Sequence, residues 1–544
     1  MTGIATLPET IGDEIPPTVA RDALTVLQPG FVGTEAPEWL LRAVAGGLGS
    51  VGLFGRNVAG PRQLARLTAQ LRAVRPDLLV AIDEEGGDVT RLDVADGSAW
   101  PGNHALGAAD DVELTRRVAR ELGRSLIRCG INHNWAPSAD INSDPDNPVI
   151  GVRSFGADPA LAARHTVAYV EGVQSVGVAA TVKHFPGHGD TATDSHLGLP
   201  EITVDAATLR AREFEPFRAA IAAGVKSVMS AHIMVPALDP DLPATLSRRI
   251  LTGVLRDELG FDGVVVTDGI EMGAIAHRWG IARGAVLALA AGADAVCVGG
   301  GLADEATVVR LRDAIALAVA SGELPAHRLA EAAGRVRALG RWTQEALFRA
   351  LPEPDTSVGL DAARRALRIT RNGDFTPIGD AELVHVVEFS PVANIAVGDQ
   401  TPWGVGSALA AALDGAGDGR RPRVRIRRLG AADLGAADLD GAALDGADAG
   451  AGNTGVGNAA EEAVRRVLAD SADRRIVLVV RDVHRYEWMR HAVSRLVAER
   501  PDAVVVEMGV PQARPAGALH IATHGAARCC GIAAAEILTG RTLG

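Results

Sequence analysis

The segment GVVVTDG at residues 263–269 combines a short apolar run with a polar end. Three consecutive valines favour an extended strand, and a continuous apolar run indicates a strand that is buried on both faces. Seven further runs of this kind lie at residues 25–31, 50–55, 78–83, 131–137, 178–185, 225–233 and 293–300. Together they predict eight strands within residues 1–345.

Helix-length segments separate most of these runs, at residues 61–75, 111–128, 205–223 and 304–321. Within 111–128, Val118, Leu122 and Leu126 recur every four residues and predict one apolar helix stripe. Eight strands that alternate with helices are typical of a TIM (β/α)8-type barrel. A doubly wound sheet would usually have fewer strands and a glycine-rich first turn, which the sequence lacks. We therefore expect an α/β fold in which residues 1–345 form a (β/α)8 catalytic barrel.

A second α/β unit is predicted at residues 381–544, after a linker at 346–380 that includes one short helix. Its expected strands and final helix lie at 381–389, 424–429, 475–483, 503–509, 520–525 and 528–538. A low-complexity Gly/Ala/Asp insertion is expected near 410–460. It contains no calcium-loop pattern, so its aspartates do not predict a metal site.

Composition and charge exclude several functions. The formal charge of −13 disfavours binding to nucleic acid or to an anionic membrane surface. The four cysteines form no C-x-x-C pattern, the first residues lack a basic and apolar leader, and no apolar stretch is long enough to span a membrane. We expect a cytoplasmic protein without a metal or a cofactor.

Polar residues gather where the predicted strands end, and a barrel of this type places catalysis at the carboxyl ends of its strands. The segments concerned are 83–91, 147–156, 183–190, 193–196 and 267–269. Asp268 ends an apolar strand, where burial of a carboxylate is costly. Its position favours a functional role over the alternative, a cap on the next helix.

Asp194 and His196 are two residues apart, so in an extended loop their side chains point the same way. A carboxylate that binds one ring nitrogen fixes the tautomer of the histidine and makes it a better acid/base near neutral pH. A solvated loop histidine is the simpler alternative. A zinc site formed by His184, His188 and His196 is a further one, although their spacing differs from H-E-x-x-H.

Taken together, these segments resemble family 3 of the glycoside hydrolases, and within it the bacterial β-N-acetylglucosaminidases. The strings that carry the resemblance are DEEGGDVTR (83–91), NPVIGVRSFG (147–156), KHFPGHGDTATDSH (183–196) and TDGIEMGA (267–274). The resemblance covers residues 20–345. The second unit resembles, more weakly, the α/β sandwich domain of that family.

The resemblance implies a role for each matching residue. Asp268 would be the nucleophile, and Asp194 with His196 the acid/base pair. Residues that would bind the sugar are Asp83, Arg91, Arg153, Lys183 and His184. Asp88 departs from the family pattern, which has Arg there, and this leaves a local ion pair missing or reversed. Glu271 is expected to face the next helix as a first-turn charge.

The implied reaction is retaining hydrolysis that releases terminal β-linked N-acetylglucosamine from cell-wall muropeptide fragments or chitin oligosaccharides. Phosphorolysis is an alternative, because a neutral histidine does not repel a phosphate acceptor. A β-glucosidase or β-xylosidase of the same family is a second alternative, and a non-catalytic sugar-binding barrel a third. The sequence does not predict the oligomeric state.

Overall fold

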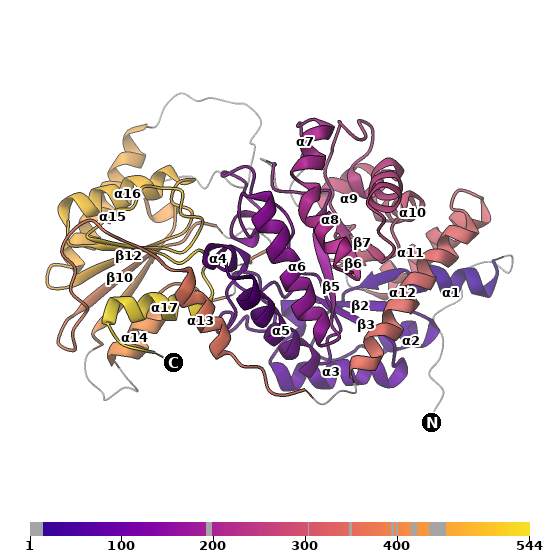
Figure 1. Ribbon diagram of the computed structural model, residues 1–544, viewed down its shortest axis with the longest axis horizontal. Helices are drawn as coiled ribbons and strands as arrows, with labels where there is room; N and C mark the ends of the chain where they lie inside the picture. Colours follow the sequence, from indigo (N-terminus) through magenta and orange to yellow (C-terminus); the bar gives the residue numbers. More distant parts are fainter. Residues whose placement is uncertain are drawn as a thin grey trace.

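The computed structural model describes residues 15–191, 199–302, 304–347, 351–392, 396–398, 401–414, 422–434 and 453–543. Figure 1 shows two bodies side by side, each built on a mostly parallel sheet with helices around it. The first sheet is formed from the amino-terminal part of the chain and the second from the carboxyl-terminal part.

The first sheet is the predicted barrel. Its strands are β1 (Leu27–Pro29), β2 (Ser50–Leu53), β3 (Leu79–Ile82), β4 (His133–Asn134), β5 (Ala179–Phe185), β6 (Ser227–Ser230), β7 (Val264–Thr267) and β8 (Val296–Val298). Strands β2 to β7 pair in sequence order, all parallel, and β1 pairs with β8. The Thr267 amide donates to the Ala295 carbonyl at 3.0 Å, which joins β7 to the segment before β8. Each predicted strand is present, and the (β/α)8-type fold is confirmed.

Helices surround these strands because each buries one apolar stripe. In α5 the buried stripe includes Val118, Leu122 and Leu126, and Asp111 caps the helix by accepting the Leu114 amide at 2.9 Å. The helices of this body are α1 (Pro17–Thr25), α2 (Glu38–Gly46), α3 (Pro61–Val74), α4 (Asn103–Ala109), α5 (Val112–Arg128), α6 (Pro159–Ser175), α7 (Ala206–Ala211), α8 (Phe214–Ala222), α9 (Gly273–Trp279), α10 (Ile281–Ala291), α11 (Glu305–Ala320) and α12 (Ala326–Leu347). Shorter turns are η1 (Gly55–Asn57), η2 (Gly151–Arg153) and η3 (Ala244–Leu246), and η4 (Arg249–Glu258) is a π-helix.

The single helix expected at 205–223 is in fact two, α7 and α8. The break falls at Arg212 and Glu213, where polar contacts replace helix geometry. The buried Glu213 carboxylate accepts from the Ser143 hydroxyl at 2.8 Å and from the Arg212 guanidinium at 2.6 Å. Arg212 also pairs with Asp190, in the loop after β5.

The second sheet has the order β11-β10-β12-β13-β14-β9. Its strands are β9 (Arg368–Arg371), β10 (Val384–Phe389), β11 (Val424–Leu429), β12 (Arg475–Val480), β13 (Val504–Glu507) and β14 (Leu519–Ala522), and only β9 runs antiparallel. Helices α15 (Asn453–Asp470) and α16 (Glu487–Glu499) lie on one face, and α13 (Ser357–Ala366), α14 (Gly406–Asp414) and α17 (Arg528–Thr539) on the other (Figure 1). The turn η5 (Ala432–Leu434) follows β11. This is the predicted α/β sandwich.

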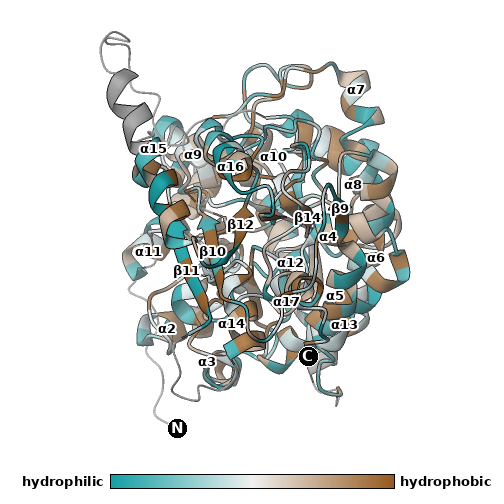
Figure 2. Ribbon diagram, turned by 90° about the vertical axis from the view of Figure 1, so that its left-hand side faces the viewer, coloured by the Kyte–Doolittle hydropathy of each residue, from teal (hydrophilic) through white to brown (hydrophobic). Residues whose placement is uncertain are grey.

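The central strands of this sheet are apolar and the edge strand β11 is not. Strands β10 and β12 are hydrophobic along most of their length, whereas β11 shows hydrophilic residues (Figure 2). The reason is burial, since β10 is wholly buried and β11 exposes Arg425, Ile426 and Arg428.

The predicted domain limits, 1–345 and 381–544, stay predictions. The stretch 346–380 holds α13, which packs against the barrel helices α4 and α5, and β9, which belongs to the second sheet. Part of the expected insertion near 410–460 lies outside the described residues. Within the described part of the chain, no helix has both the length and the apolar character needed to cross a membrane.

Candidate active site

A cavity of about 460 Å³ lies at the carboxyl ends of the barrel strands. It brings together the six described residues that the sequence predicted for the site. Those lining residues are Asp83, Arg91, Arg153, Lys183, His184 and Asp268. They come from the end of β3 and its following loop, from η2, from β5, and from the end of β7. Parallel strands explain the convergence, because their carboxyl ends meet at one edge of the barrel.

Glu85 holds two cations in this cavity. Its carboxylate accepts two hydrogen bonds from Arg153, at 2.8 and 3.0 Å, and its Oε1 lies 2.7 Å from Lys183 Nζ. Lys183 Nζ also lies 2.6 Å from Asp83 Oδ1. Burial opposes ionisation of Glu85, but Arg153 and Lys183 hold the pKa of its carboxyl well below the ordinary value. The cavity wall is thus a charged network in which each ion has a partner.

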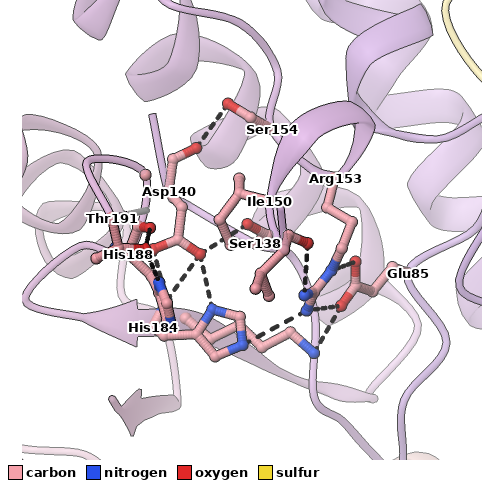
Figure 3. A network of polar contacts seen from close by, with 12 residues as sticks. Glu85, Ser138, Asp140, Ile150, Arg153, Ser154, His184, His188 and Thr191 are labelled. Atoms are coloured by element: carbon pink, nitrogen blue, oxygen red, sulfur yellow. Dashed lines mark hydrogen bonds and ion pairs between the residues drawn. The ribbon is translucent and has the colours of Figure 1, made fainter. Parts of the chain in front are cut away.

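A second buried carboxylate orients His184 (Figure 3). Asp140 Oδ2 lies 2.7 Å from His184 Nδ1, and Asp140 Oδ1 accepts the backbone amides of His184 and His188 at 3.0 and 2.7 Å. Burial alone would raise the pKa of Asp140, but His184 lowers it to about 2. The ionised Asp140 therefore accepts the Nδ1 proton and leaves His184 Nε2 on the cavity side, 3.4 Å from Arg153 Nη2.

Asp268 follows the last residue of β7 and is half-buried. Its amide donates to the Ser230 carbonyl at 3.1 Å, which ties it to β6, and its Oδ1 accepts the Gly269 amide at 2.7 Å. The next helix, α9, begins at Gly273 with Met272 at the capping position and no side-chain cap. The alternative of Asp268 as a helix cap is therefore wrong.

Asp194 and His196 lie outside the described residues, so their predicted role stays a prediction. The zinc alternative included His196 and stays open for the same reason. Among the residues that the structure does describe, no three His, Cys, Asp or Glu side chains are grouped so as to hold a metal ion.

Similarity to known proteins agrees with this geometry. The model of the "Glycosyl hydrolase family 3 N terminal domain" matches residues 31–339, more than half of the chain. The chain belongs to glycoside hydrolase family 3. The resemblance seen in its motifs is thereby confirmed.

Several relatives carry related names. The chain is 32% identical over 401 residues to "Beta-hexosaminidase A" of Pseudoalteromonas piscicida, a match that covers 68% of this chain and 65% of that relative. It is 39% identical over 280 residues to a "Beta-hexosaminidase" of Stenotrophomonas maltophilia, covering 49% and 82% of the two chains. A solved family 3 β-N-acetylglucosaminidase from Paenibacillus sp. str. FPU-7 is 34% identical, with a TM-score of 0.81 over 96% of this chain and 97% of that one.

Three residues of this family 3 site escaped the sequence analysis or were misplaced by it. Glu85 stands within the DEEGG string. Asp140 lies in the loop after β4 rather than directly at its end, so the strand-end pattern that identified Asp268 does not identify it. Glu271 does not face the next helix. It lines the cavity, and its Oε1 accepts the amides of Gly299, at 2.9 Å, and of Gly300.

Asp88, the departure from the family pattern, has an ion pair after all. Its carboxylate pairs with Arg481, which follows β12 in the second domain. The expectation was that a local pair is missing or reversed; the partner found for Asp88 lies 393 positions along the chain. Only the folded arrangement of the two domains could reveal it.

Proposed function

We propose that the protein is a retaining exo-β-N-acetylglucosaminidase that releases terminal β-linked N-acetylglucosamine through a covalent glycosyl-enzyme. The observation that carries the proposal is the placement of Asp268 in one cavity with Asp83, Lys183, Arg153 and His184. The names of the family 3 relatives support the choice of sugar.

The chemistry runs in two steps. First, an Asp268 oxygen attacks the anomeric carbon, the glycosidic carbon–oxygen bond breaks, and His196 gives its proton to the leaving oxygen. Second, water attacks the same carbon, His196 takes a proton from that water, and the bond to Asp268 breaks. Asp194 would orient and tune His196. Inversion at each step gives retention overall.

The charged wall would hold the sugar in place. Asp83 and Lys183 form an ion pair within this network, and their polar atoms suit sugar hydroxyl groups as acceptor and donor. His184 adds its Nε2 atom, and the contact of its Nδ1 with Asp140 orients the ring. Glu85 and Asp83 together neutralise Arg153 and Lys183, so the cavity favours a neutral sugar over an anion.

The natural substrate proposed is a muropeptide fragment or a chitin oligosaccharide, and the proposed compartment is the cytoplasm. All four cysteines are free thiols in buried positions, which fits a reducing environment. A β-glucosidase and a phosphorolytic variant are the competing activities. Neither has a specific observation in its favour.

The test compares initial rates on aryl β-N-acetylglucosaminide and aryl β-glucoside, in water and with added phosphate. We expect a clear preference for the 2-acetamido sugar and hydrolysis as the main outcome. Equal or faster turnover of the glucoside would overturn the choice of sugar. A slow fluorinated substrate should leave an adduct on Asp268, and an adduct on Glu271 would overturn the choice of nucleophile.

A further inference from the structure

The loop after β3 faces two ways. Toward the cavity it presents Asp83, Glu85 and Arg91. The Glu84 side chain turns back into the loop, where one oxygen accepts the amides of Arg91 and Leu92 at 2.7 and 2.9 Å. Away from the cavity, between Glu85 and Arg91, the loop presents Asp88 to the second domain. A shift of Asp88 would therefore move residues on both sides of it.

Both carboxylate oxygens of Asp88 are bound by the second domain. Oδ2 pairs with the Arg481 guanidinium, and Oδ1 accepts the Ala526 amide at 2.8 Å. The Asp88 side chain is only 2% exposed and that of Arg481 only 13%. A carboxylate so buried needs a partner, so removal of the cation leaves an unpaired buried charge.

Arg481 is itself held in position. Its guanidinium carbon lies 5.0 Å from the centre of the Trp403 ring, in the same domain. An aromatic face stabilises a cation at this distance and limits its rotamers. A second contact joins the same two bodies, because Arg91 Nη2 donates to the Ala396 carbonyl at 2.7 Å. The second domain thus contacts the loop at Asp88 and again at Arg91.

We propose that Arg481 is a positioning residue for the sugar-binding loop. By neutralising Asp88 it fixes the backbone between Glu85 and Arg91, and through them the geometry in which Arg153 and Lys183 meet the sugar. The second domain then fixes the position of the sugar-binding loop but contributes no reacting group to the site. This inference rests on the proposed function, since its readout is turnover of an N-acetylglucosaminide.

The test uses the full chain and three variants. Arg481→Met removes the cation, Asp88→Asn removes the charge but keeps the acceptor for Ala526, and Arg428→Met is the matched control. Arg428 lines the same interdomain cavity as Arg481 and also pairs with a buried carboxylate, Glu388 at 2.9 Å, within its own domain. Folding of each variant is checked by circular dichroism.

We expect Arg481→Met and Asp88→Asn to lower kcat/KM by about 10- to 100-fold, chiefly through KM, because a small misplacement of binding groups has effects of this size. Arg428→Met should stay within twofold of the unchanged protein. If Arg481→Met does not fold, Asp88→Asn alone decides. A folded Asp88→Asn protein with unchanged kinetics would overturn the proposal, as would an equal loss in Arg428→Met. If the protein without any substitution has no activity on the N-acetylglucosaminide, the proposed function is contradicted instead.

Discussion

Both domains place a buried carboxylate where a parallel strand ends, but they treat its charge in opposite ways. Glu85, just after β3, is bound by Arg153 and Lys183, which hold its pKa well below the ordinary value. Glu507, the last residue of β13, is equally buried. Its Oε1 accepts the backbone amides of Asp482 and Gly509, each at 2.9 Å.

The two carboxyls differ in pKa because of their charged neighbours: Glu85 has two cations beside it, and Glu507 has another carboxylate, Asp482. Burial, assisted by the nearby Asp482 carboxylate, raises the pKa of Glu507 to about 8. At neutral pH Glu507 is thus mostly protonated and shapes the loop after β13 as a neutral group, whereas Glu85 is an ion that organises two cations for a ligand. The same position in a parallel sheet therefore serves a site in the barrel and a scaffold in the second domain.

The largest expected effect is on the nucleophile. Asp268→Ala should lower kcat on the aryl N-acetylglucosaminide by several orders of magnitude, because the covalent step is lost. Glu507→Gln, the matched change at a strand end of the second domain, should leave kcat within about twofold, since the amide imitates a protonated carboxyl. Steady-state kinetics on both proteins measure the contrast. A comparable loss of kcat in Glu507→Gln would show that the second domain supplies a reacting group.

The next effect concerns the histidine proposed as the acid. His196→Ala should slow hydrolysis by about 10²–10⁴-fold for substrates with poor leaving groups, which need protonation. It should slow the first step much less for an activated aryl group. Asp194→Ala should show a weaker version of the same pattern. Pre-steady-state rates across a series of leaving groups measure this dependence, and a uniform loss would remove both residues from the acid/base role.

A smaller effect is expected at Glu85 itself. Glu85→Gln keeps the shape of the side chain but leaves Lys183 with Asp83, and Arg153 with the more distant Asp83 and Asp140, as counter-charges. Loss of one partner from a buried charge network costs about 3–5 kcal/mol of stability, and kcat/KM should fall by roughly 10- to 100-fold as the binding groups shift. Urea unfolding and kinetics on the same preparation check both. Unchanged stability would mean that water, rather than Glu85, solvates the charges of Arg153 and Lys183.

Sequence patterns predicted the elements well wherever apolar runs are long. The eight barrel strands and four of the six strands in the second sheet follow such runs, and the arginine-rich edge strand β11 was predicted as well. β9 escaped because Arg368, Ile369, Thr370 and Arg371 form an edge strand that is largely exposed and carries no apolar run. Exposure on an edge removes the burial on which the pattern depends.

The candidate site was predictable only in part, because some of its contacts join residues far apart in the sequence. Motifs and strand ends identified Asp268, Asp83, Lys183 and their neighbours. They could not separate Glu85 from Glu507, because both are carboxylates at strand ends. The difference lies in the cations Arg153 and Lys183, which only the folded barrel brings to Glu85. The Asp88–Arg481 pair is hidden in the same way, since it depends on how two domains meet.

The smallest effect expected is a pH dependence of stability that belongs to Glu507. A carboxyl whose pKa is raised to about 8 in the folded protein holds its proton where the unfolded chain, near its ordinary value of 4.5, has lost it. The folded state then binds more protons, so stability falls as pH rises from about 4.5 to 8 and levels off above. Glu507→Gln has no such proton to lose. Its stability relative to the unchanged protein should therefore rise by at least ~1 kcal/mol between pH 5 and 8, in urea unfolding series at several pH values. Parallel stability curves for the two proteins would mean that Glu507 is ionised in the folded state, and the contrast with Glu85 would no longer hold.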